Sequence, residues 1–228
     1  MDTGSLLSAY VLHTRRYRDS SLIVEMLSRE QGRVSCVARG ALRGRRGDGP
    51  LQPFVPLLVR LQGRGELQTL GSAETSGRPV ELTGRRIFCG LYLNELLSYL
   101  TIRHDPCSGL FVDYQTALQA LNEAPNEEPV LRRFELGMLR HLGHGPILDK
   151  DAAGQPIESG SRYTYDLEHG PVLTAADNPE AVRGLTLQAL DRGEFTDAET
   201  LREARHLMRR ILHHRLEGRP LRSRELFR

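Results

Sequence analysis

The stretch Gln31–Gly47, QGRVSCVARGALRGRRG, places a short β-strand directly before a basic loop. Its first half alternates in the manner of a strand between Gly32 and Gly40, and its second half is a glycine-punctuated loop that cannot build a core. It holds no acidic residue and five arginines: Arg33, Arg39, Arg43, Arg45 and Arg46. Burying an unpaired guanidinium costs several kcal/mol, so these side chains are expected to face solvent or a polyanion.

Four further runs of β-forming residues surround this strand within the first 80 residues. With it, the strands are expected in chain order at 9–14, 20–27, 32–39, 54–61 and 66–70. Five short strands joined by turns and one longer loop are typical of a small closed or partly open barrel. Pro56 has no amide hydrogen to donate, which favours an edge position or a bulge where the fourth strand begins.

The spacing of apolar residues becomes helical after Thr83, with Asn94 and Glu95 expected on the polar face of the first helix. Helices are predicted at 87–100, 110–121, 129–142, 185–190 and 197–214, and a β-hairpin is predicted to pair 163–165 with 171–174. Thr196 followed by Glu199 has the form of a capping box. We therefore expect an α+β protein: a barrel domain at 1–80 and a mainly helical domain at 81–228, with a loop and hairpin insertion around 144–180.

The composition and charge limit the class of protein. Hydrophobic residues make up 39% and charged residues 26% of the 228 residues, as in an ordinary globular protein. No apolar run approaches the roughly 20 residues that cross a bilayer, and the N-terminus lacks a signal-peptide pattern, so a cytoplasmic protein without membrane contact is expected. Residues 1–79 hold 12 arginines against 7 acidic residues, and residues 201–228 hold 9 against 3, so positive charge gathers at both ends.

No pattern of catalytic or metal-binding residues emerges. The three cysteines are widely spaced and form no CxxC pair, which argues against a disulfide framework or a zinc site. His206 and His213 share a helical face, but no carboxylate completes a ligand set at a fixed offset. Because the phosphate-binding loop and the nucleophile elbow are also missing, we expect no catalytic residue, no metal and no cofactor.

A nucleic-acid interface fits the basic residues better. Arg15, Arg16 and Arg18 occupy the first predicted turn, and the arginines of 31–47 occupy the third strand and the next loop. In small Greek-key barrels these elements form the face that binds oligonucleotides. Tyr17 either stacks on a base or packs within the turn. Aromatic residues are only 6% of the chain, so phosphate contacts should dominate. With five such contacts, the slope of log affinity against log salt should be roughly −3.5 for single strands.

Arg132 and Arg133 open two alternatives at the start of the third predicted helix. Beside Leu131 and Phe134 they could clamp an acidic peptide whose hydrophobic end enters a groove. Alternatively, Arg132 pairs with a neighbouring glutamate and merely solvates the helix.

Eight short motifs form a series over nearly the whole chain. They are VLHTR at 11–15, GRV at 32–34, ARG at 38–40, LQPFVPL at 51–57, GRGE at 63–66, GLYLNELL at 90–97, LRRFEL at 131–136 and PLRSRELF at 220–227. In this order they resemble the RecO family of bacterial recombinational repair proteins. The resemblance implies an oligonucleotide-binding (OB-fold) barrel followed by a helical domain. It also implies a protein of the bacterial nucleoid that binds single- and double-stranded DNA and anneals complementary strands.

The resemblance also implies partners. Members act with RecR, and often RecF, to load RecA onto DNA coated by single-stranded DNA-binding protein, and many recognise that protein's acidic, hydrophobic-ended C-terminal tail. This favours Leu131, Arg132 and Arg133 as the tail site. Some members carry a four-cysteine zinc module, but residues 144–170 contain no cysteine, so no structural zinc is expected.

The residues expected to bind DNA lie in the barrel and near the C-terminus. They are Arg15, Arg16, Arg18, Arg33, Arg39, Arg43, Arg45, Arg46, Arg209, Arg210, Arg222 and Arg224. Two basic surfaces could hold two strands at once and reduce their repulsion. An RNA-binding barrel protein, a protein-interaction adaptor and a metal-dependent nuclease remain the alternatives.

Overall fold

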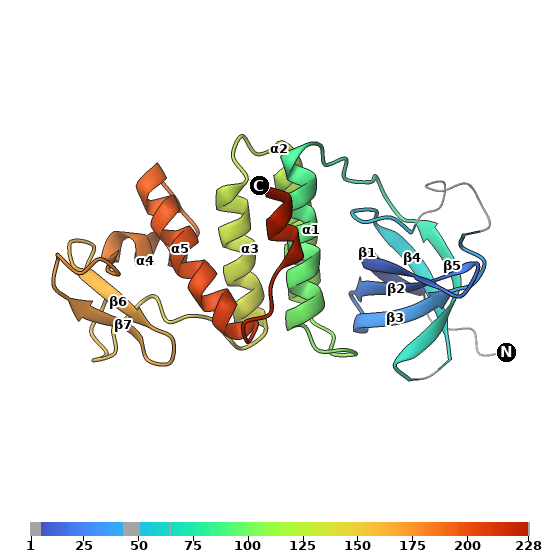
Figure 1. Ribbon diagram of the computed structural model, residues 1–228, viewed down its shortest axis with the longest axis horizontal. Coiled ribbons are helices and arrows are strands. Elements are labelled where there is room, and N and C mark those ends of the chain that lie inside the picture. The colour runs from blue at the N-terminus through green and yellow to red at the C-terminus, as the bar shows by residue number, and fades with distance from the viewer. Residues whose placement is uncertain (1–5, 43–50, 64, 228) are drawn as a thin grey trace. The chain divides into compact units, whose positions relative to one another are not determined.

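The computed structural model describes residues 6–42, 51–63 and 65–227, and its N-terminal part is a five-stranded barrel (Figure 1). The strands are β1 (Leu6–Tyr17), β2 (Ser21–Ser28), β3 (Gly32–Ala38), β4 (Leu57–Gln62) and β5 (Leu67–Thr75). The sheet runs in the order β1-β2-β3-β5-β4 and closes through the pairing of β1 with β4. The pairing of β3 with β5 is parallel and the others are antiparallel, which confirms the predicted OB-type barrel.

Alternation along the strands fills the barrel with apolar side chains. The core contains Leu7, Ala9, Val11, Val24, Met26, Val34, Cys36, Ala38, Leu57, Val59 and Leu61. Burial, reinforced by the charge of Glu25, raises the pKa of the Cys36 thiol to about 12. Cys36 is therefore a neutral core residue at physiological pH.

The first strand is longer than the sequence predicts. β1 keeps pairing with β2 as far as Tyr17, opposite Ser21, after a register shift between Val11 and His13. The assignment of Arg15 and Arg16 to a turn was therefore wrong, because both lie on β1. The turn starts at Arg18, whose φ of 54° lies in the left-handed region.

The remainder of the chain is mainly helical, with one small sheet. The helices are α1 (Arg85–Leu100), α2 (Ser108–Glu123), α3 (Glu128–His141), α4 (Gly184–Arg192), α5 (Ala198–Arg215) and a final 3₁₀ helix, Arg222–Phe227. The predicted hairpin is confirmed as β6 (Arg162–Asp166) paired with β7 (Gly170–Thr174), and β8 (Val182–Arg183) adds an unpredicted third strand. Within the described ranges, no helix combines the length and the apolar character needed to cross a membrane.

The start of α5 differs by one residue from the expected capping box. Asp197, not Thr196, is the N-cap, and its carboxylate accepts a hydrogen bond of 2.8 Å from the amide of Thr200. The hydroxyl of Thr200 also donates to Asp197, at 2.7 Å. These hydrogen bonds hold the pKa of the Asp197 carboxyl below its ordinary value.

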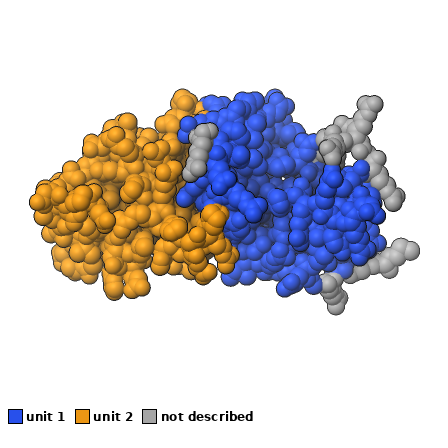
Figure 2. Space-filling view, in the orientation of Figure 1, with its two compact units in different colours: residues 1–123, 221–228 blue, residues 124–220 orange. Residues whose placement is uncertain are grey.

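The chain divides into two compact units, 1–123 with 221–228 and 124–220 (Figure 2). This division differs from the predicted boundary near residue 80, although the change from strands to helices falls there. Helices α1 and α2 belong with the barrel, and the C-terminal segment returns to α1. Glu95 accepts hydrogen bonds from the amides of Arg222 and Ser223, at 2.8 and 2.9 Å.

Asn94 joins α1 to the barrel, so its predicted place on a polar face was wrong. Its side chain is 2% exposed, and its Nδ2 donates to the carbonyls of Val11 and Leu12 at 3.3 and 3.1 Å. Its Oδ1 accepts from the hydroxyl of Tyr114 on α2 at 2.6 Å. Tyr10 packs edge-on against the same tyrosine ring. The part of β1 around residues 10–12 is therefore covered by α1 and α2 and is closed to a ligand.

Candidate nucleic-acid interface

Four exposed arginines gather at one end of the barrel. Arg15 and Arg16 lie at the end of β1, Arg18 lies in the following turn, and Arg39 follows β3 directly. The strand register aligns Arg16 with Leu22 on β2 and Leu22 with Ala38 on β3. Two strand spacings, about 10 Å, therefore separate the backbones of Arg16 and Ala38. We call Arg15, Arg16, Arg18 and Arg39 the arginine end.

The charge of the arginine end is largely uncompensated within the described residues. None of its four guanidiniums forms an ion pair or hydrogen bond with a described group, and the nearest acid in sequence is Asp19 in the same turn. The Arg18 guanidinium lies 5.1 Å from the centre of the Tyr17 ring. One face of the Tyr17 ring is therefore in cation–π contact with Arg18. Stacking of the ring on a base stays a hypothesis.

The residues that directly follow β3 lie at the same end of the barrel. The amide of Leu42 donates to the carbonyl of Ser20 at 3.0 Å, which ties the chain after Arg39 to the β1–β2 turn. Arg43, Arg45 and Arg46, also expected to bind DNA, lie outside the described residues.

Arg33 does not join this group, although the sequence placed it there. Its Nη2 and Nε donate to the carbonyl of Thr101 at 2.8 and 3.2 Å, and its Nη1 pairs with Glu25 at 3.2 Å. Only 15% of its side chain is exposed. Arg33 is therefore an internal link within its unit, and we leave it out of the interface.

The segment that follows α1 accounts for the burial of Arg33. Residues 101–105 run along the start of β3, where the amide of His104 donates to the carbonyl of Arg33 at 3.0 Å. A Cβ on Gly32 would lie 2.1 Å from the carbonyl oxygen of Asp105, so only glycine fits that approach. Glu25, unmarked by any sequence signal, pairs with both Arg33 and Arg103. Residues 101–105 thus cover the outer face of β2 and β3 near Arg33, whereas the arginine end lies at the opposite end of these strands, where its side chains are exposed.

The C-terminal arginines expected to bind DNA are divided between the two compact units. Arg209 is exposed on α5, whereas Arg210 is half-buried and donates to the carbonyl of Tyr165 at 3.3 Å. Arg222 and Arg224 belong to the other compact unit, where the Arg224 guanidinium lies 6.0 Å from the Tyr92 ring.

Of the three residues of the predicted tail site, two are buried and one is exposed. Leu131 is buried, and Arg132 forms a buried ion pair with Glu135 at 2.6 Å. The Nε and Nη1 atoms of Arg132 have no hydrogen-bond partner among the described groups. Arg133 is exposed, and its Nε donates to the carbonyl of Gly193 at 2.6 Å. The pairing of Arg132 with a neighbouring glutamate is thus the alternative that the geometry favours, in a buried setting and not a solvated one.

In the described part of the chain, no group of three or more histidine, cysteine, aspartate or glutamate side chains is placed to hold a metal ion. The chemistry of the arginine end is that of a binding surface. Guanidinium groups remain charged at all physiological pH values and match the geometry of phosphate oxygens.

In a comparison with known proteins, both halves of the chain match models of one protein family. Residues 4–78 match the family model described as "Recombination protein O N terminal", and residues 82–225 match "Recombination protein O C terminal". The chain belongs to the recombination protein O family. The resemblance found from the eight motifs is thereby confirmed.

Similar members of this family cover nearly the whole chain. "DNA repair protein RecO" of Methylococcus capsulatus is 47% identical over 222 residues, which are 96% of this chain and 91% of that protein. The protein of the same name from Nitrosococcus oceani is 46% identical over 225 residues, 97% of this chain and 92% of its own. That of Shigella flexneri is 43% identical over 224 residues, 96% and 92% of the two chains.

Proposed function

We propose that this protein acts in bacterial DNA repair by binding the sugar–phosphate backbone of single- and double-stranded DNA and annealing complementary strands. The observation that carries the proposal is the arginine end, four exposed guanidiniums without a described partner at one end of an OB-type barrel. The printed names of the similar proteins support a role in DNA repair.

The arrangement suits binding that does not depend on base sequence. Contacts to phosphates fix a strand without reading its bases. If the four arginines of the arginine end each neutralise one phosphate, the slope of log affinity against log salt is roughly −2.8 for a single strand. Affinity would then fall about 50-fold between 50 and 200 mM salt.

Annealing follows from the same charges. Two complementary strands repel each other, and guanidiniums held between them reduce the electrostatic work of bringing them together. The protein contributes cations and a scaffold in this mechanism, and base pairing supplies the specificity.

The partners proposed for this activity are those of the family. The protein would act with RecR, and with RecF where it is used, to help RecA load onto DNA coated by single-stranded DNA-binding protein in the bacterial cytoplasm. Arg133, exposed on α3, is the residue of the predicted tail site best placed to meet an acidic tail. Tail binding would raise the local concentration of the protein on coated DNA.

The experiment that tests this function is annealing of complementary oligonucleotides coated by single-stranded DNA-binding protein, with and without its C-terminal tail. The full chain should accelerate annealing on both, more strongly when the tail is present. Arg15→Gln/Arg16→Gln should lower the annealing rate several-fold, whereas Lys150→Gln/Arg192→Gln, which removes two exposed cations elsewhere, should not. No acceleration by the unaltered chain, or preference for RNA over DNA in competition, would overturn the proposal.

A further inference from the structure

The solvent-facing side of α5 carries an unbroken basic stripe. Arg202, His206, Arg209 and His213 are exposed and follow one another at intervals of four, three and four residues. This spacing places them on one side of the helix, over about 16.5 Å of its length. The opposite side buries the apolar residues of the same helix. We call these four residues the α5 stripe.

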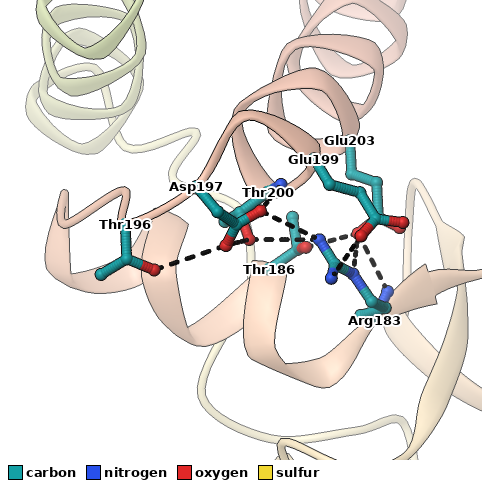
Figure 3. Close-up of polar contacts among 7 residues, drawn as sticks. All are labelled: Arg183, Thr186, Thr196, Asp197, Glu199, Thr200 and Glu203. Carbon is teal, nitrogen blue, oxygen red and sulfur yellow. Dashed lines mark hydrogen bonds and ion pairs between the residues drawn. The ribbon is translucent and has the colours of Figure 1, made fainter.

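The acidic residues of α5 do not neutralise the stripe, because Arg183 engages them. Figure 3 shows Arg183 among the carboxylates at the start of the helix: its Nη1 pairs with Glu199 at 2.9 Å and its Nε with Glu203 at 3.1 Å. The N-cap Asp197 lies 3.8 Å from its Nη2. These are the only acids of the helix and its cap, and residues 204–216 contain none.

Two other arginines of α5, Arg205 and Arg210, are turned towards groups of their own unit. Arg205 pairs with Glu128 of α3 at 3.4 Å, and Arg210 donates to the carbonyl of Tyr165. Arg202 and Arg209 form no hydrogen bond or ion pair with any group in the described ranges. The helix thus separates arginines that hold the unit together from arginines that offer their charge to solvent.

We propose that the α5 stripe is a second binding surface for the nucleic-acid backbone, carried by residues 124–220 independently of the arginine end. The inference rests on the proposed function, since it assigns a second site for the same ligand. Each strand of B-form DNA has one phosphate per 3.4 Å of rise, so the stripe spans about five phosphate steps. Arginine offers a planar fork to phosphate oxygens, and an imidazole N–H can donate to them as well.

The surface chemistry favours nucleic acid over other polyanions. An acidic peptide with a hydrophobic end, or an anionic membrane, would need apolar side chains beside the cations. None of the large hydrophobic residues exposed in the described part of the chain lies on α5. The stripe therefore suits a ligand that presents regularly spaced charge and no apolar group.

The test uses the full chain and a fluorescein-labelled single-stranded 30-mer, with affinity measured by anisotropy between 50 and 300 mM KCl. Arg202→Gln/Arg209→Gln should make the slope of log affinity against log salt shallower by about 1.4, the contribution of two phosphate contacts. Arg202→Lys/Arg209→Lys, which keeps both charges, should retain the slope. The matched control is Lys150→Gln/Arg192→Gln, which removes two exposed cations of the same unit that do not belong to α5 and should also retain it.

The outcomes separate this inference from the proposed function. If Arg202→Gln/Arg209→Gln keeps the unaltered slope while Arg15→Gln/Arg16→Gln flattens it, the α5 stripe is not a DNA site and the function of the barrel stands. If neither pair changes the slope, both proposals fall. A photoreactive amino acid at His206 should crosslink to the labelled strand, and crosslinking to an acidic peptide but not to the strand would overturn the choice of ligand.

Discussion

Replacing Asn94 by alanine should destabilise the unit that contains the barrel by about 2–5 kcal/mol. The change removes three buried hydrogen bonds: two to the carbonyls of Val11 and Leu12, and one from the hydroxyl of Tyr114. Tyr114 is fully buried, so its hydroxyl cannot turn to water for a new partner. A buried polar group left without a partner costs about 1–3 kcal/mol, and part of this cost falls on each group that Asn94 serves.

Urea unfolding followed by circular dichroism measures this cost. Tyr114→Phe should lose about 1–2 kcal/mol, and the double variant should lose about 1 kcal/mol less than the sum, because both changes remove the same hydrogen bond. Asn122→Ala, an asparagine exposed on α2, should stay within about 0.5 kcal/mol of the unaltered protein. A loss below 0.5 kcal/mol for Asn94→Ala, or full additivity in the double variant, would refute the structural role assigned to Asn94.

Three further outcomes are expected. Arg33→Gln should lower the free energy of unfolding by about 1–3 kcal/mol and leave the salt slope of DNA binding unchanged; a flatter slope would return Arg33 to the interface. Burial raises the pKa of the Cys36 thiol to about 12, so its contribution to the free energy of unfolding should be fully present below about pH 9 and be lost as the pH rises towards 12. In urea titrations, Cys36→Ala should make this decline shallower. Asp197→Ala should lower the melting temperature by a few degrees and Asp197→Ser should restore most of it. The lowered pKa of Asp197 means that its contribution is present above its ordinary pKa and lost as the pH falls further.

The sequence identifies the strands of the barrel well, because β-forming runs bounded by glycine and turn residues mark them individually. It misjudges Arg15 and Arg16, since adjacent charges are typical of a turn, whereas pairing with β2 extends β1 through both. It also misjudges Asn94, because a polar side chain at a helix junction is recognised only from the carbonyls that it meets.

The interface is predicted in part for a similar reason. Exposure of arginines at the β1–β2 turn follows from local sequence and the cost of burying charge. The hydrogen bond from Arg33 to Thr101 joins residues that are 68 positions apart, so no local sequence pattern reveals this contact. The pairing of Arg132 with Glu135 was one of two open alternatives, and its burial comes from the packing around α3.

The most direct test of the arginine end compares the salt dependence of DNA binding between the two ends of the barrel. Arg15→Gln/Arg16→Gln removes two cations of the arginine end, and Arg29→Gln/Arg60→Gln removes two exposed arginines near the start of β1, where Arg60 lies opposite Leu6. The first pair should make the slope for a single strand shallower by about 1.4, and the second should leave it unchanged. Equal slopes for both variants would contradict the assignment of the DNA site to this end of the barrel.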